Sequence, residues 1–567
     1  MSFSFTQWKT GTSANAYEFF GCHPDGQETV FRVWAPGAEN LYVTGSFCGW
    51  DPCRYPMQET EPGLFCLTIP GISQYDVYKY VRMTADGQPV FKSDPFAFHA
   101  ETAPANASKV YAMGNHAWGD GKWMSRRSPD GPLNLYQLHA GAFRTYAGGE
   151  PLNYCKLGEE LASYLKKLGC THADFLPLLE YMDPESWGRK TTGFFAITSR
   201  YGVPDDFRQM VDVLHQAEIG AVMDWCPAGF PADDFGLADF AGGPYWEAGG
   251  QEGDFRFFDF RRPEVQSFLL SSACRLFEVF HLDGLRVAGT AQIAQRPGGR
   301  EFLETLAAAV RRDFPSAFLI GGPECGAFSF REDPESAWRI MDMAAGKPGE
   351  LPRAEPGRIL ELEAEEMRRE SLIGRMPGSY DEKFARLRAG TACFRLFPGS
   401  KLSMMGNELA QFSAWQPYHE LDWLLLDYEL HRKFLYLLRS LNDFAQKSAA
   451  VRAEHPGSYR PLSLNAGAGI VGYIRQDEAG SQIFVLANFT ENPAERLTIG
   501  VDRRGKYAEL FNTDEAQYGG EGRSSGVNFA KLRPADGKPY CIEVNLPPFT
   551  TVYLYKSAGA KRPAKPV

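Results

Sequence analysis

The sequence lacks an apolar run of about 18 residues, the length with which a helix crosses a bilayer, so we expect no membrane-spanning segment. The first residues, MSFSFTQWKTGTSANAYEFF, lack the basic and apolar parts of a secretory signal. The 11 cysteines are scattered, and Cys48 and Cys53, the closest pair, have no histidine or second pair nearby. The sequence therefore predicts a cytoplasmic protein without a disulfide framework, a metal site or a cofactor.

Positive charge is also in short supply. The chain has 59 lysines and arginines against 70 acidic residues, a net charge of −11. We therefore expect neither a nucleic acid nor an anionic membrane as a partner. Aromatic residues are abundant at 14%, which fits sugar-stacking surfaces and large β-rich cores alike. The length of 567 residues suggests three or four domains, at about 150 residues each.

The pattern of apolar residues changes twice along the chain. Residues 28–114 form short apolar runs separated by PG, DG and GW turns, which predicts a small β-sandwich. Short strands then alternate with helical periodicity, as in LGEELASYLKKLG, where Leu157, Leu161, Leu165 and Leu168 share one face. This alternation predicts an α/β fold with a (β/α)8 barrel. Strand patterns return near the end and predict a second β-sandwich.

These changes give the expected domain boundaries. The predicted parts are an N-terminal sandwich with its leader (1–114), a linker (115–132), the barrel (133–448), a C-terminal all-β domain (449–557) and a short basic tail (558–567).

Specific strings carry a resemblance that extends from about residue 14 to 556. FRVWAPGAENLYVTGSFCGW resembles the N-terminal carbohydrate-binding sandwich of glycogen branching enzymes. SWGRKTTGFFAITSRYGVPDDFRQMVD, FHLDGLRVAG and FPGSKLSMMGNELAQFSAW look like their barrel, and LPPFTTVYLY is similar to their C-terminal domain. The resemblance implies an α-amylase-like retaining glycosidase fold.

The resemblance also implies a reaction. Such enzymes cut an α-1,4-glucan, hold the cut chain on a carboxylate and re-attach it through an α-1,6 bond. One carboxyl attacks the anomeric carbon, and a second protonates the leaving oxygen and later deprotonates the incoming hydroxyl. A third carboxylate and two histidines hold the sugar while positive charge develops.

Both reacting carboxyls are missing from their matching positions. The nucleophile position, in a string like DGLRVDAV, falls on Ala288, although the orienting Arg286 is present. The acid/base position falls on Gly322, and Glu324 stands two residues further on, past a proline. We therefore expect no catalytic residue of the usual kind, because a methyl group and a hydrogen atom perform neither step.

Four further positions of the implied sugar subsite are also changed. The stabilising His–Asp pair falls on Leu362 and Glu363. The histidine of a string like DWVPAHF is Gly229, and the tyrosine expected to stack on the sugar is Arg189. Together with the two reacting positions, these changes predict that the fold survives while the chemistry does not.

What remains of the implied site has two interpretations. Asp224 and Arg286 form either a residual sugar subsite or a buried ion pair that supports the barrel, and we favour the ion pair. The segments from Ala288 to Gly298 and from Glu324 to Ile359 are shorter than the resemblance implies. Both follow barrel strands, where catalytic loops lie.

An acidic cluster follows the next predicted strand. It consists of Glu361, Glu363, Glu365 and Glu366. A solvated rim is the favoured interpretation, and a repurposed acid/base pair is the alternative.

Two residues of the N-terminal sandwich match sugar-contacting positions. Trp50 offers a flat apolar face for a glucose ring, and Lys79 offers donors for hydroxyl groups. The alternative is that both only pack the domain. Cys48 replaces an asparagine that the resemblance implies beside the tryptophan.

The favoured function is a catalytically inactive branching-enzyme homologue that binds α-glucan or acts as a regulatory or scaffold partner in glycogen metabolism. One alternative is an active branching enzyme whose carboxylates are the displaced Glu324 and Glu363. Another is a structural subunit of an active branching enzyme.

Overall fold

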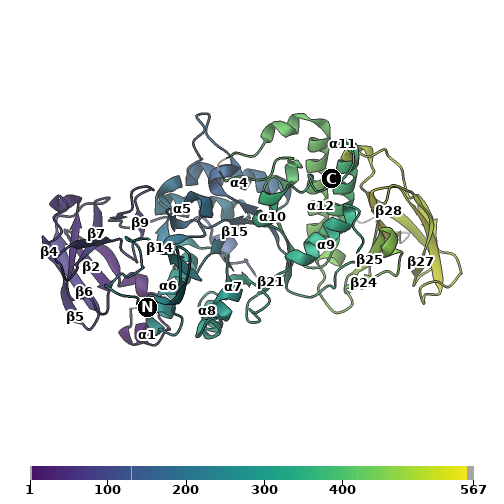
Figure 1. Cartoon of the computed structure of the whole chain (residues 1–567). Coiled ribbons are helices and arrows are strands. Elements are labelled where there is room, and N and C mark those ends of the chain that lie inside the picture. The colour runs from purple at the N-terminus through teal and green to yellow at the C-terminus, as the bar shows by residue number, and fades with distance from the viewer. Residues whose placement is uncertain (1–2, 129–130, 418, 558–567) are drawn as a thin grey trace. The chain divides into compact units, whose positions relative to one another are not determined.

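The computed structural model describes residues 3–128, 131–417 and 419–557, so the expected tail at 558–567 lies outside the described residues. The chain divides into two compact units, which are treated separately (Figure 1). The first unit comprises Met1–Pro129, His139–Ser163 and Asp174–Arg331, and the second comprises Asp130–Leu138, Tyr164–Ala173 and Glu332–Val567.

The N-terminal part of the first unit is the expected β-sandwich. One sheet has the order β1-β2-β6-β5, and the other has the order β4-β3-β7-β10-β9 with β8 paired to β7. Phe31 of β2 and Tyr78 of β7 meet edge to face at 5.1 Å, which places the core between the two sheets. The strands are β1 (Gly21–Asp25), β2 (Glu28–Trp34), β3 (Leu41–Gly45), β4 (Tyr55–Pro56), β5 (Gln58–Glu61), β6 (Leu64–Pro70), β7 (Val77–Met83), β8 (Pro89–Lys92), β9 (His99–Ala100) and β10 (Ser108–Lys109).

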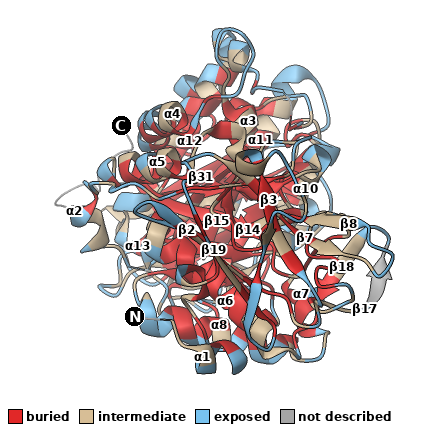
Figure 2. Cartoon of the chain, turned by 90° about the vertical axis from the view of Figure 1, so that its left-hand side faces the viewer, coloured by how far each residue is buried: buried red, intermediate tan, exposed pale blue. Residues whose placement is uncertain are grey.

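Eight strands form the predicted barrel. They close in the order β11-β12-β15-β19-β20-β21-β22-β23, and the pairs with a recorded register run parallel. Figure 2 shows β15 and β19 in red, because every residue of both strands is buried. The strands are β11 (Asn134–Leu138), β12 (His172–Phe175), β15 (Gly220–Trp225), β19 (Gly284–Val287), β20 (Phe318–Gly321), β21 (Phe330–Glu332), β22 (Arg358–Leu362) and β23 (Ser400–Met404).

The helices between these strands follow the predicted apolar stripes. Leu157, Leu161, Leu165 and Leu168 of α4 are all buried, as their spacing predicts. The long helices are α4 (Tyr154–Leu168), α5 (Pro204–Gln216), α6 (Pro263–Phe280), α8 (Gly299–Asp313), α9 (Pro334–Ala344), α11 (Tyr380–Leu396) and α12 (Glu429–Lys447). None of the helices in the described part of the chain is long and apolar enough to cross a membrane.

One strand–helix unit of the barrel lacks its helix. Residues 322–329, between β20 and β21, form only turns and bends. A parallel connection usually takes a dozen or more residues and contains a helix. Beside this short connection, Val310 of α8 and Phe328 line a cavity of about 140 Å³. The shortened connection therefore leaves part of α8 without the neighbour that a complete (β/α)8 barrel provides.

The C-terminal part of the second unit is the second predicted β-sandwich. A six-stranded sheet, β24-β25-β26-β31-β28-β29, and a two-stranded sheet, β27-β30, share one apolar core that includes Phe484, Ile499 and Ile542. The strands are β24 (Tyr459–Pro461), β25 (Ile470–Gln476), β26 (Gln482–Asn488), β27 (Ala494–Val501), β28 (Lys506–Asn512), β29 (Val527–Phe529), β30 (Tyr540–Leu546) and β31 (Thr550–Ser557).

The expected linker is fixed to the first unit by buried charges. It contains a short helix, α2 (Gly121–Met124), and its polar side chains reach α5 and the residues around β19. Its ion pairs are His116–Asp212 at 3.5 Å, Asp120–His215 at 3.0 Å, Asp120–His281 at 2.8 Å and Arg127–Asp283 at 3.1 Å. The described part of this segment is therefore a structural element of the unit.

His215 joins two carboxylates in this network. Its Nδ1 lies 3.0 Å from Oδ2 of Asp120, and its Nε2 lies 3.0 Å from Oδ2 of Asp283. Burial opposes protonation, but the hydrogen bonds and charges of the two aspartates win and raise the pKa of His215. Burial lowers the pKa of His281. His215 therefore holds its proton more strongly than His281.

We expect His215→Gln to lose about 3–5 kcal/mol of unfolding free energy at pH 7, because breaking a buried ion pair leaves its partners uncompensated. The raised pKa means that the contribution of His215 is fully present below the unfolded-state pKa of about 6.5 and is lost as pH rises through its folded-state pKa. Urea unfolding should therefore show the difference from wild type shrinking as the pH is raised above the unfolded-state pKa of about 6.5. A gap that widens over this range would contradict the assignment. His419→Gln, on the surface, is the control.

Candidate functional site

Asp224 and Arg286 lie at the carboxyl ends of two neighbouring barrel strands, where catalytic residues of such barrels are found. The two residues are directly paired in the register of β15 and β19, and Arg286 Nη1 donates to Asp224 Oδ2 at 3.3 Å. Both side chains are buried. The favoured interpretation, a buried ion pair, thus describes their geometry, and this geometry leaves the sugar-subsite interpretation untested.

Ala288 follows β19 directly. Its N–H donates to the Trp225 carbonyl at 2.8 Å, which fixes its backbone to the end of β15. Gly289 comes next with a φ of +73°, a left-handed conformation that glycine adopts without strain, and α7 (Thr290–Ala294) begins after it. A half-buried methyl group therefore stands where the resemblance implies the nucleophile.

Glu324 folds back over Gly322, the position that the resemblance assigns to the acid/base. A Cβ atom built on Gly322 would lie 2.5 Å from Oε1 of Glu324. That oxygen is shielded from solvent and has no hydrogen-bond partner among the described residues. The Gly322 N–H donates to Thr290 Oγ1 at 3.1 Å. The carboxyl of Glu324 thus lies where a side chain at position 322 would begin.

The space beside Gly229 is filled by main chain. Gly229 belongs to β16 (Gly229–Pro231), which pairs antiparallel with β18 (Phe255–Phe258), and β17 (Glu247–Glu252) pairs with the other edge of β18. A Cβ atom at position 229 would lie 2.1 Å from the Arg256 carbonyl oxygen and 2.6 Å from the Phe255 ring. A histidine side chain, which the resemblance implies at position 229, would therefore have no room in this structure.

Arg189 lies near the thiol of Cys226. It follows a short turn after β13 (Leu179–Tyr181) and precedes β14 (Thr191–Ile197), and its guanidinium lies 5.2 Å from the Trp187 ring centre. Burial raises the pKa of Cys226 to about 12, the charges of Arg189 and Arg286 lower it, and that of Asp224 raises it. Two guanidinium groups and one carboxylate therefore lie close enough to the thiol to affect its pKa.

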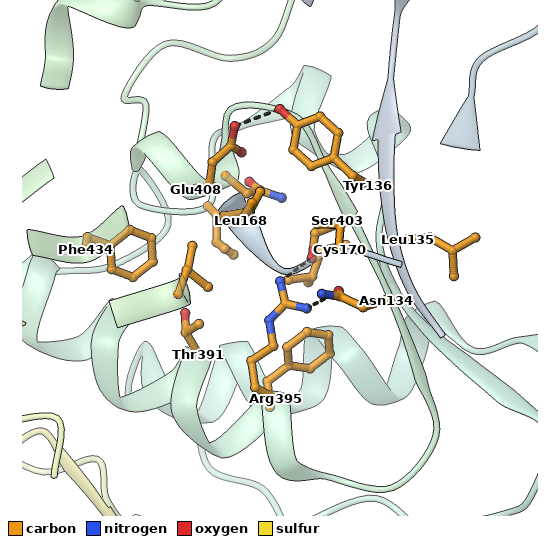
Figure 3. Close-up of a pocket in the computed structure, with 15 residues that line it drawn as sticks. Asn134, Leu135, Tyr136, Leu168, Cys170, Thr391, Arg395, Ser403, Glu408 and Phe434 are labelled. Carbon is orange, nitrogen blue, oxygen red and sulfur yellow. Dashed lines mark hydrogen bonds between the residues drawn. The ribbon is translucent and has the colours of Figure 1, made fainter. Parts of the chain in front are cut away.

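Leu362, in the second unit, lines a cavity with side chains of α11 and α12 (Figure 3). Phe394 of α11 and Leu438 of α12 line the same cavity. Because neighbouring residues of a strand point to opposite faces, Glu361 lies on the other face of β22. A side chain at position 362 therefore faces the helices that cover the strand.

The prediction of a solvated acidic rim is wrong for Glu361. That residue is only 1% exposed, because β22 carries it into the interior. Glu363 is half-buried at the start of α10 (Ala364–Arg369), and Glu366 pairs with Arg375 at 2.8 Å. The sequence did not indicate this burial, because a glutamate is usually exposed.

Trp50 and Lys79 lie on adjoining segments of the N-terminal sandwich. Trp50 is 38% exposed, and its N–H donates to the Gly45 carbonyl at 3.0 Å. Lys79 is paired across the sheet with Thr44, the residue before Gly45. Its ammonium group donates to Asn106 Oδ1, and burial lowers its pKa. The tryptophan face is therefore accessible, while the lysine already has an internal partner.

Sequence reasoning did not single out Thr290, Phe255 or Arg256 as shaping this site. Thr290 could have been suspected from its position just after Ala288. The backbone of Arg256 carries no such signal, because a main-chain contact is independent of the side chain. No group of three or more potential metal ligands occurs within the described ranges.

Comparisons with known proteins agree with this architecture. Residues 19–97 match carbohydrate-binding module 48, the isoamylase N-terminal domain, and residues 463–557 match the alpha amylase C-terminal all-beta domain. A pullulanase from Paenibacillus barengoltzii has a similar fold, with a TM-score of 0.75 at 16% identity over 98% of this chain and 97% of that one. The fold is thus that of the α-amylase superfamily.

Sequence relatives define the family more closely. The 1,4-alpha-glucan branching enzyme GlgB of Desulfitobacterium hafniense is 35% identical over 95% of each chain. The GlgB of Halothermothrix orenii is 32% identical over 96% of this chain and 97% of that one. The chain belongs to the GlgB-type 1,4-α-glucan branching enzyme family.

Proposed function

We propose that this chain is a catalytically inactive member of its family that binds α-glucan and acts as a regulatory or scaffold partner in glycogen metabolism. The observation that carries the proposal is the pair Ala288 and Gly322 at the carboxyl ends of β19 and β20, where the family reaction needs a nucleophile and an acid. Neither residue carries a titratable group.

The charges around the site support the same proposal. Glycosyl transfer builds positive charge on the sugar, which carboxylates stabilise and cations oppose. Here Arg189, at the position where the resemblance implies a tyrosine, adds a guanidinium near Cys226. This additional cation is unfavourable for the transition state of the family reaction.

The test is a branching assay with amylose, which follows the loss of iodine colour and the gain of isoamylase-sensitive branches. The D. hafniense relative serves as the positive control. We expect wild-type turnover at least about 10⁴-fold below that of an active enzyme, the scale of loss when covalent machinery is removed. Turnover within 100-fold of the control would overturn the proposal.

A specific observation favours a second candidate, an active branching enzyme with a displaced acid. Glu324 places its carboxyl beside Gly322 and leaves one shielded oxygen without a partner among the described residues. If this group is the acid, Glu324→Gln abolishes turnover, whereas the matched surface variant Glu301→Gln does not. Turnover insensitive to Glu324→Gln would eliminate this candidate.

The exposed face of Trp50 supports glucan binding by the N-terminal sandwich. Because Trp50 has a φ of +64° and an alanine keeps the same strain, Trp50→Ala removes the ring without a new backbone cost. We expect wild-type protein to be retarded in native gels containing glycogen and the variant to lose at least about 1 kcal/mol of binding, the scale of one aromatic contact. The control is Tyr428→Ala, which removes another exposed ring. Unchanged retardation of the Trp50 variant would place the site elsewhere.

The proposed partner is α-glucan, together with an active branching enzyme or another glycogen enzyme in the cytoplasm. Co-purification of an active branching enzyme with the tagged chain from its native host would support the scaffold role.

A further inference from the structure

A second cavity of the second unit opens at the amino ends of the barrel strands β11 and β23, away from the carboxyl ends that carry the family site. It has a volume of about 290 Å³. Residues of α11, α12 and the short helix α13 (Ala449–Arg452) complete its wall. Thr171 and Gln446 contribute polar groups to the lining. The volume is ample for a ligand the size of a sugar phosphate.

Among the described residues, every charged side chain that lines this cavity is a cation. They are Arg395, Lys401 and Arg452. Lys401 is buried, while Arg452 is exposed at the end of α13. A wall with three cations favours an anionic occupant.

The two inner cations are Arg395 and Lys401, and their hydrogen bonds go to uncharged oxygens. Arg395 donates to Asn134 Oδ1 at 2.7 Å and to Ser403 Oγ at 3.3 Å (Figure 3). Its Nε is buried without a partner among the described residues. Lys401 donates to the carbonyls of Phe397, at 2.7 Å, and Gly399, at 2.5 Å. Neither side chain has a carboxylate to balance its charge at contact distance in the described structure.

A fourth cation lies behind the wall. Arg475 of β25 is buried and donates to the carbonyls of Leu396, Val451 and Ala453 at 3.1, 2.8 and 2.6 Å. Burial and the charges of Arg475 and Arg395 hold the pKa of Lys401 well below its ordinary value, and the exposed Glu454 only partly opposes them. The inner cations thus repel one another.

The carbonyls at the end of α11 compensate this charge only in part. A helix C-terminus carries about half an elementary negative charge. Glu408, the carboxylate that acts on Arg395, accepts hydrogen bonds from Tyr136 and Tyr164 at 2.7 and 2.8 Å. The guanidinium of Arg395 therefore keeps an incompletely balanced positive charge beside the cavity, and an anion bound there would also favour the charged form of Lys401.

We propose that this cavity binds a small phosphate-bearing anion, with Lys401 and Arg395 at its base and Arg452 at its mouth. The oxygens of a phosphate accept several hydrogen bonds at once, and charge-assisted bonds of this kind are about twice as strong as neutral ones. The ligand class is inorganic phosphate or a phosphomonoester. The site is separate from the proposed function, since it uses none of the family's catalytic positions.

The test is thermal unfolding and calorimetric titration of the full chain with sodium phosphate, at an ionic strength held constant with sodium chloride. We expect a phosphate-dependent rise in the unfolding temperature that chloride does not give. The same titration is made with glucose 6-phosphate, a phosphomonoester, and with glucose as the control that lacks the phosphate. Tighter binding of the phosphomonoester than of phosphate identifies an organic ligand, and the reverse identifies the free anion.

Variants assign the binding to the cavity. Lys401→Met keeps the length of the buried stem and removes the charge, and we expect at least tenfold weaker binding. Arg452→Ala changes an exposed residue and tests the site even where Lys401→Met fails to fold, and we expect at least threefold weaker binding. Arg504→Ala, another exposed arginine, is the matched control and should leave binding unchanged. The absence of a phosphate-specific effect, or unchanged binding in either cavity variant, would overturn the proposal.

Discussion

Gly229→Ala is expected to destabilise the protein by about 3 kcal/mol or more, a large loss for one methyl group. The added carbon would stand 2.1 Å from the Arg256 carbonyl oxygen, so β16 and β18 would have to separate. Separation weakens the hydrogen bonds of the small sheet and exposes the Phe255 ring. The measurement is urea unfolding at constant pH, compared by midpoint and slope.

The matched control is Gly326→Ala, a glycine with open space around it in the connection after β20. That change should stay within about 0.5 kcal/mol of wild type, as surface substitutions usually do. Equal stability of the two variants would show that the backbone at position 229 yields easily. In that case a histidine could return to this position, and the site would be easier to restore than its geometry indicates.

Restoring the two missing carboxyls should recover very little activity. We expect the double variant Ala288→Asp, Gly322→Glu to branch amylose at least about 10³-fold more slowly than the D. hafniense relative, because each absent transition-state contact costs about 10²–10³. The Cβ atom of the new glutamate would meet only the end of the flexible Glu324 side chain, which can move aside at little cost. Three positions of the implied subsite, Gly229, Leu362 and Arg189, would still differ from the family pattern.

The assay for this variant is the same measurement of isoamylase-sensitive branches, with Ala288→Asn, Gly322→Gln as the isosteric control. Both double variants should behave alike within tenfold, because the surroundings limit the reaction. Activity of the carboxyl variant within tenfold of the active relative would show that the sugar subsite is intact and that only two residues separate this chain from catalysis.

The fold was predictable because it repeats a simple signal many times. An apolar stripe along a helix predicts that this face is buried. Leu157, Leu161 and Leu165 form such a stripe on α4, and all three are buried. The absence of a helix between β20 and β21 was harder to predict. A short segment after a strand indicates a loop, but it does not show where the next strand of the barrel begins. The parallel contact of Ile320 with Phe330 depends on the rest of the barrel.

That Ala288 and Gly322 carry no carboxyl was also readable from the sequence, because the residue type alone decides whether a carboxyl is present. The position of Glu324 was not, since the turn after Pro323 determines where its side chain points. The closure of the space at Gly229 depends on β18, whose approach comes from main-chain pairing. Sequence reports which groups exist, and tertiary contacts determine where they meet.

The segment between the first sandwich and the barrel has a consequence for dissecting the chain. A polar stretch such as HAWGDGKWMSRR invites cleavage there to obtain two independent pieces. A barrel fragment that begins after this stretch would lose the linker partners His116 of Asp212, Asp120 of His215 and Arg127 of Asp283, whereas His215 and Asp283 would keep each other. Each of these buried groups would then have one charged partner fewer than in the full chain. The segment after the sandwich therefore stabilises the barrel. Removing this segment together with the sandwich would destabilise the barrel fragment that remains.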